Sequence, residues 1–425
     1  LDNFPNIGVI GGGVVGMTVA KIIQDNLKKC NITIIADKYY DDTVSCVAAG
    51  IFRPGTTFRG PTNEITKRWI DNSWRYWDNL LKTPDAPKLG VMSLSAYIFS
   101  KQNSHVTKNH LIENLVPIYR PVSEAELKFG PKGARFGSLF STLKIECERY
   151  LPYTANQIIE KGGKLITSKI ENFASLSNID NFDLVFNCTG MGAKYLCDDH
   201  NLVPIRGQIL KVHAPWVKMA VYGDYDAYII PGFNGIVTLG GVRQYDSYNL
   251  DYCKYDAEAI KERCYELMPS LKDAKIVTHK VGLRPHRTPV RVEPEIVNGL
   301  KVVHCYGHGG YGVMTAPGTA EHAVELGLDL LRISLWPLLN SYYTYLFYLN
   351  DPVVPEIIAF NKSNKLFSFL IALGTYLSEK FIHITCSKYL IFGCCHCRGI
   401  KEMPAILKFA VFEPIGYKID KCRFL

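Results

Sequence analysis

The chain begins with a hydrophobic run, a cluster of glycines and a second hydrophobic run. Residues 7–10 are typical of a buried strand, residues 11–16 hold four of the glycines, and residues 17–23 continue as a helix. A further apolar run at residues 32–35 predicts a second strand. This order predicts the βαβ unit of a doubly wound parallel sheet.

The pattern up to about residue 190 predicts further helices and strands of a mixed α/β fold. Ser123 and Glu126 have the spacing of a capping box at a helix start. Helices are expected over residues 66–81 and 151–161, and strands over residues 92–99, 164–167 and 183–190.

Between residues 205 and 243 the pattern changes to short strands separated by Pro-Gly and Gly-Gly pairs, which predicts an inserted antiparallel sheet. The α/β pattern then returns and closes the body with a strand, a second glycine loop and a helix. Residues 335–425 are rich in Tyr, Phe and Cys without a clean period, and we assign them to no part of the fold. The expected elements are strands 207–213, 227–230, 236–240 and 302–306, the loop 307–312, and helices 256–268 and 319–333.

Composition narrows the class of protein. The 425 residues are 47% hydrophobic and 21% charged, enough for one large domain or two. The net charge of +8 is mild and comes without a run of Lys and Arg, so nucleic acid is not an expected partner. No stretch has the length of a membrane span. The thirteen cysteines lack regular spacing, which is typical of reduced thiols inside the cell.

The first glycine cluster has the spacing of a dinucleotide-binding fingerprint. Gly11 permits the tight turn, Gly13 lets the backbone approach a pyrophosphate, and Gly16 lets helix and strand pack closely. Asp37 follows at the distance expected of an acid that accepts a hydrogen bond from a ribose hydroxyl. The alternative is a glycine-rich turn in an ordinary α/β fold, which the complete order of elements disfavours.

Three closely spaced arginines form a second candidate site. Arg284, Arg287 and Arg291 have prolines between them, which exclude a helix. A rigidly held guanidinium suits bidentate capture of a carboxylate, although a surface loop with solvated arginines is the alternative. Tyr228 and Arg243 flank two predicted strands, and such a tyrosine alone is most often a packing residue.

Together these features resemble the D-amino-acid oxidase family, and within it the branch that oxidises D-aspartate. The resemblance runs from about residue 6 to residue 333. The segments that carry it are Asp37-Lys38, Val47–Gly50, Pro204–Gln208, Ala214–Val217, Gly282–Pro285 and Tyr306–Gly309.

The resemblance implies non-covalent FAD and no metal. The residues expected around the ADP half are Gly11, Gly13, Val14, Val15, Gly16, Asp37 and Lys38. Those expected near the flavin are Val44, Ser45, Gly50, Ile51, Gly309, Gly312, Val313 and Met314.

The resemblance also implies a substrate site and a reaction with molecular oxygen. Arg284 would pair with the α-carboxylate, the Tyr228 hydroxyl would assist, and the Gly310 carbonyl would accept from the amine. Hydride then leaves Cα for the flavin, oxygen gives hydrogen peroxide, and the imino acid hydrolyses to a 2-oxo acid and ammonia.

Arg243 indicates an acidic substrate. The D-aspartate oxidases carry arginine at this position, and an arginine left unpaired in a partly desolvated pocket would be costly without a second carboxylate. We expect D-aspartate, with D-glutamate and N-methyl-D-aspartate as further candidates.

The chain departs from the acidic branch at three places. Gly55 stands where that branch usually has histidine, residues 222–225 stand where it has another arginine, and the loop at residues 309–312 resembles the neutral branch. Arg53 is a cation close to the first of these. The alternatives are an oxidase of neutral or basic D-amino acids, an inactive nucleotide-binding protein, and a nicotinamide dehydrogenase, which would leave Arg284 unexplained.

The expected fold is α/β, a Rossmann-like FAD-binding domain with an inserted, mainly antiparallel β substrate domain. Residues 1–50 and 291–334 would form the FAD-binding domain, 51–190 would contribute to both domains, 191–290 would be mainly substrate sheet, and 335–425 an extension. The family implies a peroxisomal location, otherwise a cytoplasmic one, although Cys422-Arg423-Phe424-Leu425 matches a Ser-Lys-Leu address poorly. The oligomeric state stays open.

Overall fold

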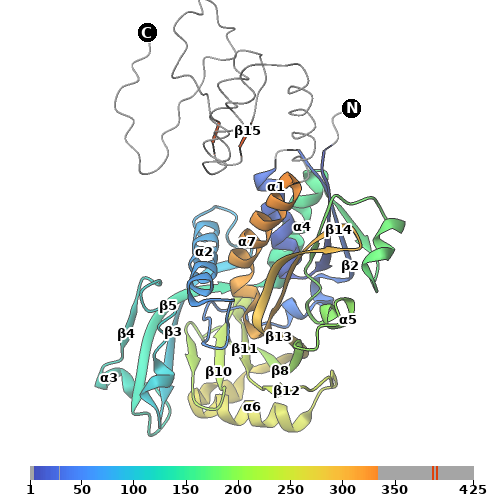
Figure 1. Ribbon diagram of the computed structural model, residues 1–425. Coiled ribbons are helices and arrows are strands. Elements are labelled where there is room, and N and C mark those ends of the chain that lie inside the picture. The colour runs from blue at the N-terminus through green and yellow to red at the C-terminus, as the bar shows by residue number, and fades with distance from the viewer. Residues whose placement is uncertain (1–3, 28, 334–384, 387–388, 391–425) are drawn as a thin grey trace, which may run out of the picture. The chain divides into compact units, whose positions relative to one another are not determined.

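The computed structural model describes residues 4–27 and 29–333, together with two short strands further on (Figure 1). The chain divides into two units, Leu1–Arg332 and Ile333–Leu425. The strands of the second unit, β15 (Thr385–Cys386) and β16 (Tyr389–Leu390), pair with each other. The rest of the predicted extension, with the C-terminal residues compared with a peroxisomal address, lies outside the described residues.

The first unit contains the predicted parallel sheet. β1 (Asn6–Gly12) lies between β2 (Asn31–Tyr39) and β7 (Leu184–Asn187), with every neighbouring pair parallel. β6 (Lys164–Thr167) extends the sheet beyond β2, and β14 (Leu300–His308) extends it beyond β7. The helix α1 (Val14–Asn26) packs against β1 and β2 and against α4 (Cys147–Glu160). The βαβ start predicted from the glycine cluster is therefore confirmed.

The same sheet continues without a break into antiparallel strands. β13 (Lys275–Val297) pairs with β14 on one side and with β8 (Val203–His213) on the other. The two predicted parts thus share one sheet, of fourteen strands within the described residues. Beyond β8 the order is β11 (Ile236–Gly240), β10 (Tyr228–Pro231), β9 (Ala220–Tyr222), β3 (Val91–Ser100), β5 (Phe136–Ile145) and β4 (Tyr119–Pro121), while β12 (Gln244–Tyr245) pairs with β8.

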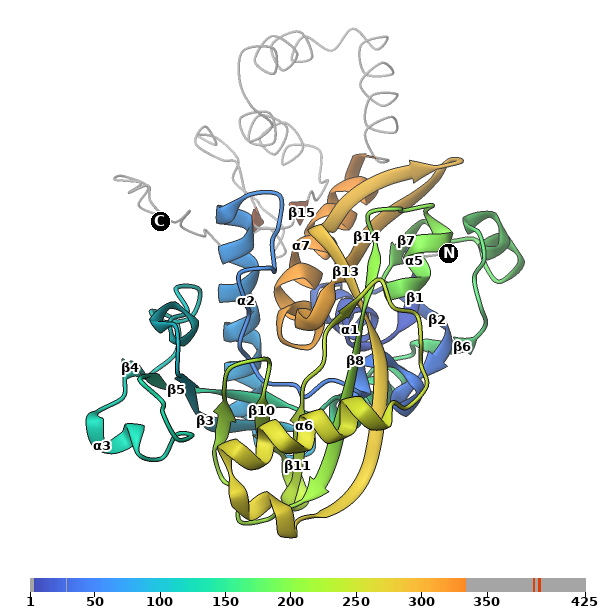
Figure 2. The same cartoon turned by 90° about the horizontal axis from the view of Figure 1, so that it is seen from below.

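The proline-rich arginine segment lies within β13. Pro285 and Pro289 exclude a helix, and the extended conformation that the sequence predicts is confirmed. The strand runs for 23 residues, longer than predicted, and its pairing with β14 is interrupted between His286 and Arg291. The helix α6 (Lys254–Leu267) packs across β8 and β11 (Figure 2).

Two helices that lie side by side bury two of the three tryptophans of the second predicted helix (Figure 1). α2 (Asn63–Leu81) is capped by Thr62, whose hydroxyl accepts from the Ile65 amide at 3.2 Å. Trp69 and Trp77 are fully buried on the face toward α7 (Gly312–Ile333). The helix α7 begins earlier than the predicted Thr319 because it continues through Pro317.

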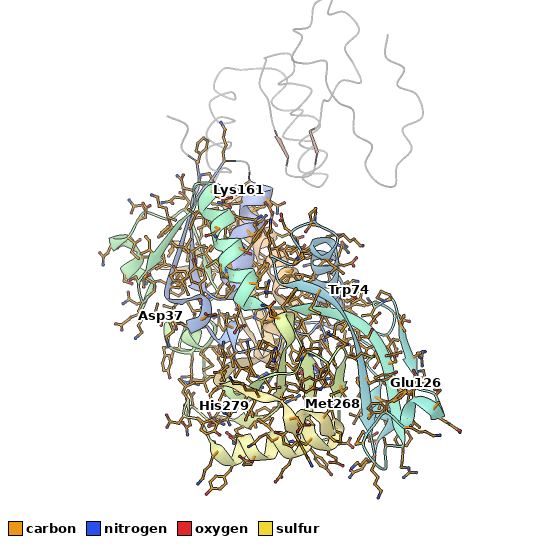
Figure 3. All side chains as sticks on the ribbon, turned by 180° about the vertical axis from the view of Figure 1, so that it is seen from behind. Asp37, Trp74, Glu126, Lys161, Met268 and His279 are labelled. Carbon is orange, nitrogen blue, oxygen red and sulfur yellow. The ribbon has the colours of Figure 1, made fainter. Side chains whose placement is uncertain are left out.

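The short helices complete the unit. The capping box predicted at Ser123 and Glu126 is present at the start of α3 (Glu124–Leu127). Glu126 and Asp37 lie on opposite sides of the unit (Figure 3). Among the described residues, no helix has the length and apolarity needed to cross a bilayer. The other short helices are α5 (Ala193–Leu196) and 3₁₀ turns at Tyr40–Asp42, Val44–Cys46, Ser104–Thr107, Phe173–Asn178, Gly190–Gly192, Phe233–Gly235, Pro269–Asp273 and Gly309–Tyr311.

Candidate active site

A cavity of about 1110 Å³ lies where the parallel and antiparallel parts of the sheet meet. It is lined by the glycine turn after β1, the ends of β2 and β7, the middle of β13 and the start of α7. The residues predicted to bind the cofactor and the substrate line it except Gly16. Of the three arginines in the proline-rich segment, only Arg284 lines it, because Arg287 and Arg291 form ion pairs with acidic residues elsewhere. A Cβ at Gly16 would overlap the Gly11 carbonyl, so this glycine packs α1 against the turn.

The glycine turn presents backbone to the cavity because side chains do not fit there. Gly11 has a φ of +124°, and a Cβ on it would overlap the Cys188 carbonyl. A Cβ on Gly12 would lie 2.5 Å from the Lys38 carbonyl oxygen. Gly13 begins α1 without a side-chain cap. The positive end of the helix dipole therefore faces the cavity, which favours an anionic group there.

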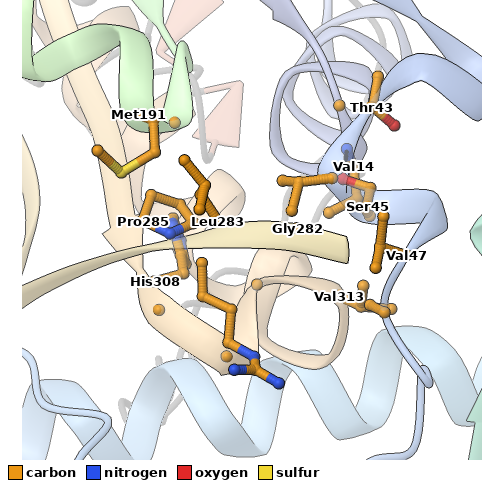
Figure 4. Close-up of a pocket in the computed structure, with 18 of the residues that line it drawn as sticks. Val14, Thr43, Ser45, Val47, Met191, Gly282, Leu283, Pro285, His308 and Val313 are labelled. Atoms are coloured by element: carbon orange, nitrogen blue, oxygen red, sulfur yellow. Dashed lines mark hydrogen bonds between the residues drawn. The ribbon is translucent and has the colours of Figure 1, made fainter. Parts of the chain in front are cut away.

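Ser45 supports this turn from the side. Its hydroxyl oxygen accepts a hydrogen bond from the Val14 amide at 3.0 Å, so one amide of the first helical turn is already bonded. Figure 4 shows Val14 and Ser45 across the cavity from Met191 and Pro285, with Gly282 and Leu283 of β13 between them. These contacts place Ser45 at the turn as well as on the cavity wall.

The carboxyl ends of neighbouring parallel strands form the rest of the cavity wall around the glycine turn. Asp37 and Lys38 lie near the end of β2 and line the cavity. Residues 168–171 follow β6 and residues 189–191 follow β7, and both segments line it too. Residues 168–171 were not predicted as site residues, although the ends of neighbouring parallel strands meet at one edge of a sheet, which was the available signal.

Arg284 lies at the other end of the cavity and is held between two glycines. Its Nη1 donates to the Val242 carbonyl at 2.9 Å and to the Arg206 carbonyl at 3.4 Å. A Cβ on Gly207 would lie 2.5 Å from the Arg284 guanidinium carbon, and one on Gly310 would lie 3.3 Å from Arg284 Cδ. The guanidinium is thus fixed by neutral carbonyls, which leaves its charge available to a ligand.

Tyr228 lies next to Arg284 and packs against the glycines at the end of β11. A Cβ on Gly241 would lie 2.5 Å from the Tyr228 ring, so the ring can take this position only because residue 241 has no side chain. Burial raises the pKa of Tyr228, and the charge of Arg284 opposes this increase. The hydroxyl therefore stays protonated at neutral pH and is able to donate a hydrogen bond.

The structure corrects the premise on which Arg243 was assigned. Arg243 lines the cavity, but its Nη2 pairs with Asp226 Oδ1 at 2.9 Å, and the two side chains are 46% and 39% exposed. Asp226 has a φ of +59° in the turn before β10. Arg243 is therefore neither buried nor unpaired, and it has no need of a ligand carboxylate to offset desolvation.

Tyr311 fills the space beside Gly55, the position at which the resemblance predicts histidine. A Cβ on Gly55 would lie 2.5 Å from the Tyr311 hydroxyl oxygen, which is 2.8 Å from Thr57 Oγ1. Tyr311 was not predicted as a site residue, although it belongs to the loop at residues 309–312 that departs from the acidic branch. At the second departure, the Arg53 guanidinium lies over the Tyr222 ring, 4.6 Å from its centroid.

Comparison with known proteins identifies the family to which the chain is similar. Residues 6–326 match the family described as FAD dependent oxidoreductase. A D-aspartate oxidase of Homo sapiens is 38% identical over 341 residues, which cover 79% of this chain and 98% of the relative. A D-amino acid oxidase of Dugesia ryukyuensis is 32% identical over 77% of this chain and 98% of the relative.

Solved structures share the fold at lower identity. A glycine oxidase from Bacillus cereus has a TM-score of 0.64 at 17% identity, over 76% of this chain and 97% of that chain. An L-α-glycerophosphate oxidase from Mycoplasma pneumoniae with FAD bound has a TM-score of 0.62 at 16% identity, over 76% and 94%. The predicted fold class is therefore confirmed.

Proposed function

The chain belongs to the FAD-dependent oxidoreductase family that includes the D-amino-acid oxidases, and on this premise we propose that it oxidises acidic D-amino acids, D-aspartate foremost. The observation that carries the acidic preference is the excess of positive charge along one cavity, which is lined by Arg53, Arg243 and Arg284. Asp226 offsets one of these charges by pairing with Arg243. One guanidinium suffices for the α-carboxylate, so the remaining positive charge favours a second carboxylate. The name of the human relative supports the same choice.

The residues on the nucleotide side of the cavity fit FAD. The turn at Gly11–Gly13 excludes side chains and turns the N-terminus of α1 toward a diphosphate, and Asp37 lies near the end of β2 beside it. Gly309 and Gly310 before α7, and Gly312 at its start, present backbone to the opposite wall, beside the side chains of Tyr311, Val313 and Met314. When bound, FAD supplies the acceptor for the hydride of Cα and reacts with oxygen to give hydrogen peroxide.

The chain's own residues bind and orient the amino acid. We assign the α-carboxylate to Arg284 and to the protonated hydroxyl of Tyr228. The Gly310 carbonyl would accept a hydrogen bond from the amine, which reacts in its neutral form after losing its proton to solvent, and would so orient it at Cα. This arrangement asks only for positioning and a fixed positive charge, and no side-chain base is required.

A direct assay of the purified protein tests the proposal. The protein should carry FAD, and D-aspartate should give hydrogen peroxide, ammonia and the 2-oxo acid, whereas L-aspartate should give none. We expect kcat/KM for D-aspartate to exceed that for D-alanine by roughly 100-fold, the size of one buried charge pair. A higher kcat/KM for D-alanine, D-methionine or D-arginine would contradict the acidic preference.

One observation favours a second candidate, an oxidase of neutral D-amino acids. Asp226 already neutralises Arg243, which reduces the positive charge available to a second carboxylate. Tyr311 adds a polar but uncharged hydroxyl at Gly55. The same substrate series separates the two candidates.

A further inference from the structure

Arg53 is the arginine of the cavity that lacks a polar partner for its side chain within the described residues. Its Nε is buried and has no hydrogen-bond partner. Arg284 donates to carbonyls and Arg243 pairs with Asp226, so Arg53 differs from both. A buried guanidinium nitrogen without an acceptor costs free energy of folding, which a ligand with an anionic oxygen would recover.

The backbone around Arg53 is fixed on both sides. The Phe52 amide donates to the Leu143 carbonyl at 2.8 Å, and the Phe52 carbonyl accepts from Thr142 Oγ1 at 2.6 Å. The Arg53 amide contacts Met314 Sδ at 3.3 Å, and the Pro54 carbonyl accepts from Asn109 Nδ2 at 2.9 Å. The side chain of Arg53 therefore projects from a backbone segment that hydrogen bonds hold on both sides.

The guanidinium of Arg53 also has a defined place in the cavity. It lies over the Tyr222 ring at 4.6 Å, and the Tyr222 ring is 6.0 Å from the ring of Tyr228. Tyr228 is the neighbour of Arg284, which we assign to the α-carboxylate. Stacking on tyrosine leaves the edge of a guanidinium free for two parallel hydrogen bonds. Arg53 and Arg284 thus flank a pair of tyrosines at the substrate end.

We infer that Arg53 binds the distal carboxylate of a dicarboxylic D-amino acid. The inference rests on the proposed function. Arg243 stays engaged with Asp226, and Tyr311 fills the volume beside Gly55. Neither position therefore offers a free cation for the second carboxylate, whereas Arg53 does.

Binding of two matched ligands to the FAD-loaded protein tests the inference without turnover. Succinate has the carbon skeleton and both carboxylates of aspartate, whereas butyrate has one carboxylate. Each is titrated against the flavin absorbance of the wild type and of Arg53→Gln. We expect Arg53→Gln to weaken succinate at least roughly 30-fold, with butyrate changed by less than about threefold. The KM for D-aspartate should rise in parallel, and that for D-alanine should not.

Two further variants serve as control and safeguard. Arg59→Gln alters an exposed arginine of the same segment outside the cavity and should leave both titrations unchanged. Arg53→Lys keeps the charge but loses the planar fork, so succinate should weaken by roughly fivefold with butyrate unchanged. If Arg53→Gln does not fold, Arg53→Lys still decides, because equal effects on the two ligands contradict the inference.

The outcomes separate this inference from the proposed function. A selective loss of succinate in Arg243→Gln, with none in Arg53→Gln, overturns the role of Arg53 and leaves D-aspartate oxidation intact. Equal affinity of the wild type for succinate and butyrate overturns the role of Arg53 by itself. Preference for D-alanine over D-aspartate in turnover overturns the proposed function.

Discussion

The orientation of Arg284 depends on an atom that is absent, the Cβ of Gly207. The guanidinium lies against the bare backbone of β8, where a Cβ would be 2.5 Å from its carbon. The Val242 carbonyl then fixes one nitrogen at 2.9 Å. This contact requires arginine at 284 and glycine at 207, because the guanidinium occupies the space that a side chain at 207 would need.

We predict that Gly207→Ala disturbs binding and not folding. The new methyl group meets the far end of a flexible side chain, so Arg284 moves and the strand does not. Displacement of a positioning group by about 1 Å costs up to about 100-fold in rate. We expect kcat/KM to fall at least tenfold for every D-amino acid, with succinate and butyrate weakened equally.

Steady-state kinetics, flavin titrations and thermal melting check this prediction. The melting temperature should stay within about 3 °C of the wild type, because we expect the free energy of unfolding to change by about as little as in a surface substitution. Unchanged butyrate affinity in Gly207→Ala would show that Arg284 does not hold the α-carboxylate.

Among the elements, α7 shows how a helix passes through a proline. Pro317 lacks an amide hydrogen, and its ring also disturbs the bonds of its neighbours. Ser73 of α2 accepts from the Gly318 amide at 2.8 Å, and its hydroxyl hydrogen lies between the Trp69 carbonyl at 2.7 Å and the Thr315 carbonyl at 3.2 Å. Trp77 Nε1 donates to the Met314 carbonyl at 3.0 Å. Side chains of α2 thus replace the bonds that α7 cannot make with itself.

We predict that Ser73→Ala lowers the free energy of unfolding by about 1–3 kcal/mol, because it leaves the buried Gly318 amide without an acceptor. Urea unfolding of the FAD-free protein measures the change. Ser93→Ala on an exposed position of β3 is the control and should stay within about 0.5 kcal/mol. Equal losses in the two variants would argue against the role given to Ser73.

The sequence predicted those elements whose cause is local. The helical pattern of α2, the capping box of α3 and the glycine turn after β1 each carry their own signal, and each was found. The start of α7 was misplaced because the compensation for Pro317 comes from α2, far away in the sequence. The ion pair of Arg243 was missed for the same reason, since Asp226 reaches it only through the fold of the turn before β10.

At the scale of the whole molecule, one buried histidine joins three adjacent strands. His304 of β14 contacts Asn187 of β7 at 3.1 Å and Glu295 of β13 at 2.9 Å. Asn187 donates from Nδ2, so Nδ1 of the histidine accepts and Nε2 donates to Glu295. Burial lowers the pKa of His304 to about 4, Arg291 adds to the decrease, and Glu295 opposes it.

We predict that this histidine makes the fold sensitive to acid. Its folded pKa of about 4 lies below the ordinary value of 6.5, so between these values the unfolded chain binds a proton that the folded chain does not. Stability therefore falls as the pH falls from 6.5 to 4, by up to about 3 kcal/mol from this group.

Urea unfolding at pH 7.5 and pH 5 measures the effect. Burial also lowers the pKa of His322 to about 4, so His304→Gln should remove only part of the pH dependence. The exposed His105→Gln is the control and should leave the slope unchanged. A wild-type slope in His304→Gln would exclude the assigned role.

We also predict that residues 1–334 suffice for cofactor binding and turnover. The whole cavity lies within the first unit, and the family match ends at residue 326. A chain that ends at residue 334 should bind FAD and match the kcat of the full chain within about twofold, as a change outside the site leaves the barrier unaltered. Loss of FAD from the shorter chain, measured by its absorbance, would contradict this expectation.

The length of β13 has a consequence for how the two halves move. The strand pairs with β8 from Lys275 to His286 and with β14 from His286 to Val297, so at His286 both neighbours bind the same residue. A hinge between the halves would have to break this ladder. The halves are therefore expected to open together, with amide hydrogens of β8, β13 and β14 exchanging at one slow rate, and substrate entry must use local motion at the cavity mouth.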